Sequence, residues 1–164
     1  MNQLKITIVM IVVNLIIGAC SIDNLSSPPI QTHNPPDAEN GEQIYFTSTS
    51  QSGERIRYTG GPVLGGMMMG SYLTCASCHG PTGRGGRHTM HMTVMDAPDI
   101  RYVELAEEME EHGSEEGEYD LETFRKAVMD GEHPDGDSLD RDMPRWKMSD
   151  KDLADLFAFL QSLE

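Results

Sequence analysis

The stretch CASCHG, residues 75–80, decides the fold of this 164-residue chain. Cys75 and Cys78 place two thiols at positions i and i+3, and His79 directly follows the second thiol. Paired cysteines of this kind serve three sorts of site: half of a zinc site, a dithiol redox pair, or the attachment point of a c-type haem. The chain has 3 cysteines, and the third is Cys20, near the N-terminus.

Haem attachment suits the surrounding sequence better than zinc or dithiol chemistry. A closed zinc site needs four ligands, usually as two separated pairs, and only His88 and His91 keep a mixed zinc site open here. A thioredoxin-like dithiol follows a strand in a βαβ unit, whereas the flanks here are rich in glycine. We therefore predict one covalent haem c. Cys75 and Cys78 would form thioethers with its two vinyl groups, and His79 would bind the iron.

The first 19 residues have the pattern of an export signal. Lys5 precedes an apolar run that ends in small residues and is shorter than the roughly 20 residues that span a bilayer. A retained anchor helix is the alternative interpretation. The segment 17–20 resembles a bacterial lipoprotein box, which implies that residues 1–19 are removed and that Cys20 is lipidated.

Residues 20–37 follow as a proline-rich tether with few apolar groups and no periodicity. The remaining residues, 38–164, suit one small domain. Several acyl chains anchor a protein stably in a membrane. We expect an extracytoplasmic protein that is lipid-anchored to a bacterial membrane and faces a periplasm or the cell surface.

Met143 is the strongest candidate for the second axial ligand of the iron. It precedes Pro144, which disfavours helix at the residue before it and fixes the loop. Ser149 then predicts a helix start, and apolar residues recur at helical spacing from Leu153 to Leu163. This order of haem motif, Met-Pro and final helix resembles the class I cytochrome c family, in which the methionine binds the iron.

The resemblance implies an all-α fold, a small cytochrome c domain whose N- and C-terminal helices cross and whose loops wrap the haem. Residues 39–46 would form the first helix. Gly41 and Tyr45 stand where the family has a glycine and an aromatic residue at the crossing. Leu156 and Phe159 of the final helix would pack against them.

Two further helices and an insertion are expected between these ends. Apolar spacing predicts a helix over 99–109 and a second one with Asp120 as its N-cap and Gly131 as its C-cap. Residues 47–74 are the insertion, because compact members of the family run almost directly into the cysteine motif. We expect a loop or small hairpin there, with residues 54–58 alternating like a short strand.

The resemblance also implies contacts around the haem. The segment after the motif would wrap the side of the haem that carries His79. The carbonyl of Pro81 would accept a hydrogen bond from the His79 ring and so orient the ligand. Arg84 or Arg87 would pair with a haem propionate, or either would be an ordinary solvated cation.

Other soft donors compete with Met143 for the iron, namely Met148, Met67, Met68, Met69, Met90, Met92, Met95, His88 and His91. The clusters at 67–69 and 88–95 also suit Cu(I), so a copper site is an alternative use for them. We favour the simpler interpretation, in which these methionines fill irregular apolar space around the haem.

The chain is strongly acidic, with a formal net charge of −15. Nine acidic residues and no Lys or Arg lie between Glu104 and Asp120. Nucleic acid is excluded as a partner because its binding rests on cationic neutralisation of phosphate. The acidic run is either a solvated face or a surface that steers the protein towards a basic redox partner.

Together these features predict an electron carrier rather than an enzyme, acting alone or as a subunit of a larger oxidoreductase complex. Its partners would be redox donor and acceptor proteins, chiefly membrane complexes. A methionine ligand favours reduced iron, so the potential should exceed that of a bis-histidine haem. A haem-based gas sensor, in which Met143 leaves the iron, and a copper-handling lipoprotein are the alternative functions.

Overall fold

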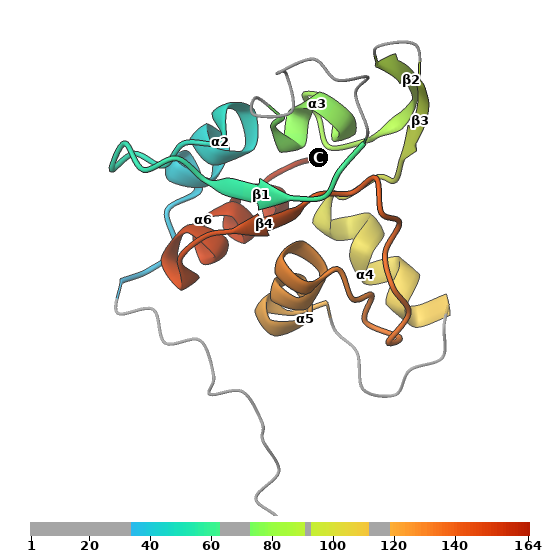
Figure 1. The fold of residues 1–164 in the computed structure, drawn as a ribbon. Coiled ribbons are helices and arrows are strands. Elements are labelled where there is room, and N and C mark those ends of the chain that lie inside the picture. The colour runs from blue at the N-terminus through green and yellow to red at the C-terminus, as the bar shows by residue number, and fades with distance from the viewer. Residues whose placement is uncertain (1–33, 63–72, 91–92, 112–118) are drawn as a thin grey trace, which may run out of the picture.

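The computed structural model describes residues 34–62, 73–90, 93–111 and 119–164 (Figure 1). Its helices are α2 (Ala38–Thr47), α3 (Cys75–His79), α4 (Tyr102–Glu111), α5 (Leu121–Arg125), which continues as the π-helical segment η3 (Lys126–Asp130), and α6 (Asp150–Gln161). Its strands are β1 (Arg57–Thr59), β2 (Gly86–Met90), β3 (Thr93–Ala97) and β4 (Arg145–Lys147). Within these ranges no helix is long and apolar enough to cross a membrane. The predicted signal, Cys20 and most of the tether lie outside the described residues.

The N-terminal helix α2 packs across the C-terminal helix α6, as predicted (Figure 1). A Cβ atom on Gly41 would lie 2.0 Å from the carbonyl oxygen of Asp155 and 2.8 Å from Cβ of Phe159. No side chain fits in that space, so glycine allows the two helices to approach this closely. Tyr45 is fully buried, and its ring centroid lies 5.2 Å from that of Phe159.

A buried carboxylate reinforces this crossing. Asp155 has no solvent exposure and accepts hydrogen bonds from the Asp37 backbone N–H at 2.8 Å, Asn40 Nδ2 at 2.6 Å and Lys151 Nζ at 2.5 Å. Burial alone would raise the pKa of Asp155, but these donors outweigh it and the pKa is lowered. The carboxylate therefore ties the start of α2 to the middle of α6.

The prediction of an all-α fold is wrong, because the domain also contains two antiparallel sheets of two strands each. In one, β1 pairs with β4, and Tyr58 lies opposite Trp146 with their ring centroids 4.9 Å apart. In the other, β2 and β3 form a hairpin over residues 86–97. The first pairing joins segments far apart in the chain, and three-residue strands are too short to leave a periodic signal.

The insertion before α3 forms a strand, as expected, but with a different partner. It begins with a tight turn, in which Thr49 and Arg55 form an isolated bridge. The strand β1 overlaps the expected segment 54–58, yet it pairs with β4 instead of forming a hairpin of its own. Residues 63–72 of the insertion lie outside the described residues.

The remaining helices largely match their predicted ends. Asp120 caps α5, where its carboxylate accepts from the Thr123 N–H at 2.8 Å, and Gly131 ends η3 with a positive φ of 74°. Ser149 caps α6 by accepting from the Asp152 N–H at 3.1 Å. The helix predicted over 99–109 begins instead at Tyr102.

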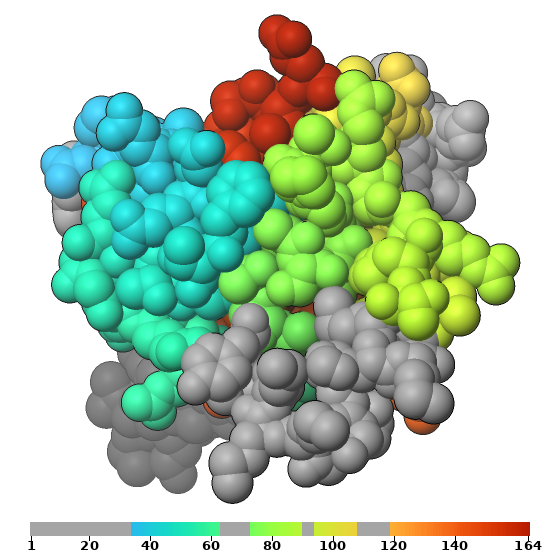
Figure 2. Space-filling view, turned by 90° about the horizontal axis from the view of Figure 1, so that it is seen from above, coloured from blue at the N-terminus to red at the C-terminus, as the bar shows by residue number. Residues whose placement is uncertain are grey.

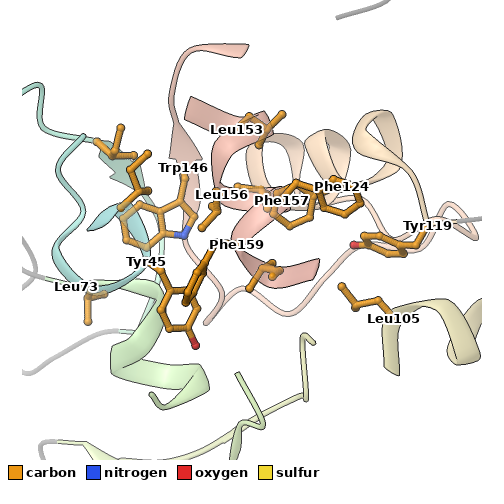
Figure 3. Close-up of a cluster of buried hydrophobic side chains, with 14 residues drawn as sticks. Tyr45, Leu73, Leu105, Tyr119, Phe124, Trp146, Leu153, Leu156, Phe157 and Phe159 are labelled. Carbon is orange, nitrogen blue, oxygen red and sulfur yellow. The ribbon is translucent and has the colours of Figure 1, made fainter. Parts of the chain in front are cut away.

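Aromatic and leucine side chains of these elements form one buried cluster (Figure 3). Tyr45, Phe159 and Trp146 gather at one end of the close-up, whereas Phe157, Phe124 and Tyr119 extend towards α4 at the other. The rings of Phe124 and Phe157 lie 5.0 Å apart, which packs α5 against α6. Several members of this cluster also line the cavity beside α3.

Candidate haem-binding site

The CASCH stretch forms a single helical turn, α3, whose ends are fixed by neighbouring residues. Thr74 Oγ1 accepts from the Ser77 N–H at 3.2 Å, and Ser77 Oγ accepts from the Thr74 N–H at 3.1 Å, which makes a capping box. Helical spacing then places Cys75 and Cys78 on the same face of the turn. Seen from above, residues 73–80 (green) lie at the surface between the N-terminal segment and the β2–β3 hairpin (Figure 2).

A cavity of about 470 Å³ opens beside α3. This volume lies within the range of small-molecule and cofactor sites, roughly 300–1,000 Å³. Both cysteines, His79 and Met143 line it. Its other walls are largely apolar and include Leu73, Ile100, Leu105, Phe124, Val128, Trp146, Leu156 and Leu160.

The donor set on these walls fits a covalently attached haem. Two thiols from one helical turn, an imidazole and a thioether share a single apolar space. Thioether attachment needs the two thiols, and a six-coordinate iron of the cytochrome type needs the other two groups. Among the described residues, no group of three or more His, Cys, Asp or Glu side chains is placed to hold a bare metal ion.

His79 is held by the backbone of another segment. Its side chain is buried, and Nδ1 lies 2.9 Å from the carbonyl oxygen of Pro98. With Nδ1 donating to this carbonyl, Nε2 remains available as a ligand. The prediction that Pro81 is this acceptor is wrong, because the acceptor is Pro98. Pro81 is exposed in the turn after α3, whereas Pro98 follows β3 and its carbonyl lies beside Nδ1 of the His79 ring.

Burial shifts the pKa values of the thiols and the imidazole in the direction that favours their neutral forms. Desolvation lowers the pKa of His79, although its bond to Pro98 opposes this effect. Desolvation likewise raises the pKa of the Cys75 thiol to about 12. The pKa of Cys78 is also raised, chiefly by burial and then by the nearby Asp142 carboxylate. A neutral imidazole is the form that coordinates a metal.

Tyr45 has a second role that the sequence did not reveal. Its hydroxyl donates to the carbonyl oxygen of Gly80 at 2.6 Å. This bond joins α2 to the residue immediately after His79, and it ties the helix crossing to the haem motif. Burial raises the pKa of Tyr45 above its ordinary value, so the hydroxyl stays protonated as a donor.

Met143 reaches the same cavity from the loop before β4. It is half-buried, its N–H donates to the Asp140 carbonyl at 3.1 Å, and the next residue, Pro144, is buried. Met148 packs against the core but does not line the cavity, and neither does His88. Met95 does line it, from the strand that leads into Pro98. The competing donors at 67–69 and 91–92, and the side chain at 90, lie outside the described residues.

The structure does not bring the two predicted propionate partners to the cavity. Arg84 is exposed and donates from Nη2 to the Glu164 carbonyl at 3.0 Å, and Arg87 is exposed on β2. His133, for which the sequence predicted no role, does line the cavity. Its Nδ1 lies 2.9 Å from Asp135 Oδ1. No sequence pattern marks this histidine, because it reaches the cavity only through the course of the loop after η3.

A comparison with known families matched most of the chain to one family model. The family model described as Cytochrome c matches residues 38–164. No curated protein and no solved structure was matched by the chain. The matched range starts with α2 and runs through α6, so it contains the cavity and all four of its candidate haem-binding side chains.

Proposed function

Because this chain belongs to the cytochrome c family, we propose that it is a single-haem electron carrier whose axial ligands are His79 and Met143. Family membership establishes covalently bound haem c and electron transfer in general terms. When bound, haem c supplies a one-electron Fe(III)/Fe(II) couple. The observation that carries the proposal is that Cys75, Cys78, His79 and Met143 line one apolar cavity.

The residues of the cavity act by holding and shielding rather than by acid–base chemistry. Pro98 fixes the His79 ring in the tautomer that leaves Nε2 free. The apolar walls limit the access of water, and a low local polarity is one of the factors that tune the potential of a haem. A thioether from Met143 favours reduced iron, so the potential should be higher than that of a bis-histidine haem.

Replacement of Met143 by alanine tests the ligand assignment. In a host that attaches haem c, the wild type should keep haem on a denaturing gel and show a weak near-infrared Fe(III)–thioether band. Met143→Ala should keep the covalent haem and lose the band, because the cysteines are intact and the thioether is gone. Met148→Ala is the matched control, since it removes a methionine that packs on the core outside the cavity.

One result would contradict the ligand assignment, and another would contradict the role of electron carrier. If the band survives in Met143→Ala, another residue, such as Met95, is the ligand. CO binding to the reduced protein distinguishes an electron carrier from a gas sensor, because the six-coordinate iron of a carrier resists CO binding. Rapid CO binding by the reduced wild type would favour the sensor hypothesis instead.

We also propose that the domain is tethered outside the cytoplasm through a lipid on Cys20. The support is the sequence of residues 1–37, with its export pattern, lipoprotein box and proline-rich linker. At the membrane surface, its electron donors and acceptors are membrane-bound redox proteins. The chain acts alone or as a subunit of a larger oxidoreductase complex. Cys20→Ser should release haem-loaded protein from the membrane fraction. Retention of that variant in the membrane would contradict lipid anchoring.

A further inference from the structure

The guanidinium of Arg145 is enclosed by the loop that carries Met143. Nη1 donates to the Met143 carbonyl at 2.5 Å and to the Asp140 carbonyl at 3.4 Å. Nη2 donates to the Leu139 carbonyl at 2.9 Å and also reaches Asp140 at 3.4 Å. One side chain therefore binds three backbone carbonyls of a five-residue stretch, residues 139–143.

The guanidinium also lies against Gly131, at the end of η3. A Cβ atom on Gly131 would lie 1.7 Å from Nε of Arg145, so only glycine leaves room for the guanidinium. Gly131 also accepts from the Leu139 N–H at 2.8 Å, which closes the loop on itself. The guanidinium is thus held between η3 and residues 139–143, while the Arg145 backbone belongs to β4.

These contacts hold the backbone of Met143 at both its N–H and its carbonyl. Its N–H donates to the Asp140 carbonyl, its carbonyl accepts from Arg145, and Asp140 also accepts from Arg145. Among the described residues, Arg145 forms no ion pair with a carboxylate, and its guanidinium donates to backbone carbonyls. The guanidinium therefore stabilises the conformation of the loop backbone instead of neutralising an acidic side chain.

We propose that Arg145 is a positioning residue that keeps the methionine loop closed, so that the Met143 thioether stays at the iron. This inference rests on the proposed function, because it requires Met143 to be the ligand. The guanidinium suits this role since its planar fork carries five N–H donors and keeps its charge at all physiological pH values. Lysine would offer a point charge with three donors and could not span the same carbonyls.

The experiment compares Arg145→Gln and Arg145→Lys in the full chain matured with haem c. Loss of hydrogen bonds from a charged donor should raise the population of the open loop, and with it the CO association rate of the reduced protein, by about tenfold or more. The near-infrared band of the oxidised protein should weaken in parallel. Arg141→Gln is the matched control, because it removes the same charge from an exposed side chain of the same loop.

A role confined to stability would lower the unfolding midpoint of both Arg145 variants but leave the CO rate and the band at wild-type values, and that result overturns the proposal. So would equal effects of Arg141→Gln and Arg145→Gln. If Arg145→Gln does not accumulate with haem, Arg145→Lys carries the test alone, because it keeps the charge. Met143→Ala distinguishes failure of the ligand assignment from failure of the positioning role. A band that survives in it refutes the ligand assignment, whereas wild-type behaviour of the Arg145 variants refutes only the positioning role.

Discussion

The two sides of the cavity present their candidate ligands by different means. On the histidine side, α3 supplies both cysteines and His79 from five consecutive residues, and its cap comes from Thr74 and Ser77 within the same turn. On the methionine side, Met143 depends on a loop that starts at Gly131 and closes around the side chain of Arg145. One ligand is positioned by its neighbours in sequence, the other by contacts across a longer stretch of chain.

This difference indicates where the site should open first. The histidine side is short, capped and joined to the haem by two covalent bonds, so its ligand has little freedom to move away. The methionine side has no covalent link, and its geometry rests on hydrogen bonds within the loop, several of them from one guanidinium. Local opening is easiest where the fewest contacts must break at once. Ligand loss is therefore expected at Met143 rather than at His79.

Gly131→Ala should have the largest effect on the methionine side. Gly131 has a φ of 74°, and a Cβ atom there would displace the Arg145 guanidinium. We expect a loss of about 2–4 kcal/mol, from backbone strain together with lost hydrogen bonds to a charged group. Urea unfolding measures the stability, and the near-infrared band reports the ligand. The band should weaken because the guanidinium can no longer hold the loop.

Gly136→Ala provides the matched control for that change. Gly136 also has a positive φ, 91°, but an added Cβ would meet no atom within 4 Å. It should cost only the strain of the left-handed conformation, about 1–2 kcal/mol, and leave the band unchanged. Equal loss of the band in the two variants would show that loop strain in general, and not the position of Arg145, governs Met143.

The same contrast explains what the sequence could predict. The haem motif, Met143 before Pro144, and the caps at Asp120 and Ser149 are local patterns, and each was visible in consecutive residues. Gly41 at the helix crossing was found through family resemblance and not through any rule of spacing. In each of these cases a few neighbouring residues carry the information.

The features that the sequence missed depend on the path of the folded chain. The acceptor for His79 is Pro98 rather than the nearby Pro81, because the chain leaves through the β2–β3 hairpin before it returns. The pairing of β1 with β4 joins two three-residue segments, neither of which has a recognisable partner in the sequence. The sequence assigned no role to Arg145, and only the folded loop shows which carbonyls it binds.

The smallest effect is expected on the histidine side, at Arg101. This arginine is buried, and its Nε and Nη2 bind the Asp99 carboxylate at 2.7–3.1 Å, next to Pro98 in the chain. Burial would raise the pKa of Asp99, but the hydrogen bonds and charge of Arg101 outweigh it and lower the pKa. Unlike Arg145, this guanidinium neutralises carboxylates, Asp99 and Glu104, and donates to no carbonyl of a ligand-bearing loop in the described residues.

Arg101→Gln should therefore lower stability without disturbing either ligand, and its effect should depend on pH. A carboxylate whose pKa is depressed in the folded state adds stability above its ordinary pKa, about 3.9 for Asp, and this contribution is lost as the pH falls through the lowered value. The urea midpoint of Arg101→Gln should lie below that of the wild type at pH 7, and the two should converge below about pH 4. Arg57→Gln, exposed on β1, controls for the loss of one positive charge.

Because the methionine loop is intact in Arg101→Gln, its near-infrared band should match the wild type at pH 7. A weakened band would mean that the histidine side also moves easily, and the contrast between the two sides would fail at that point.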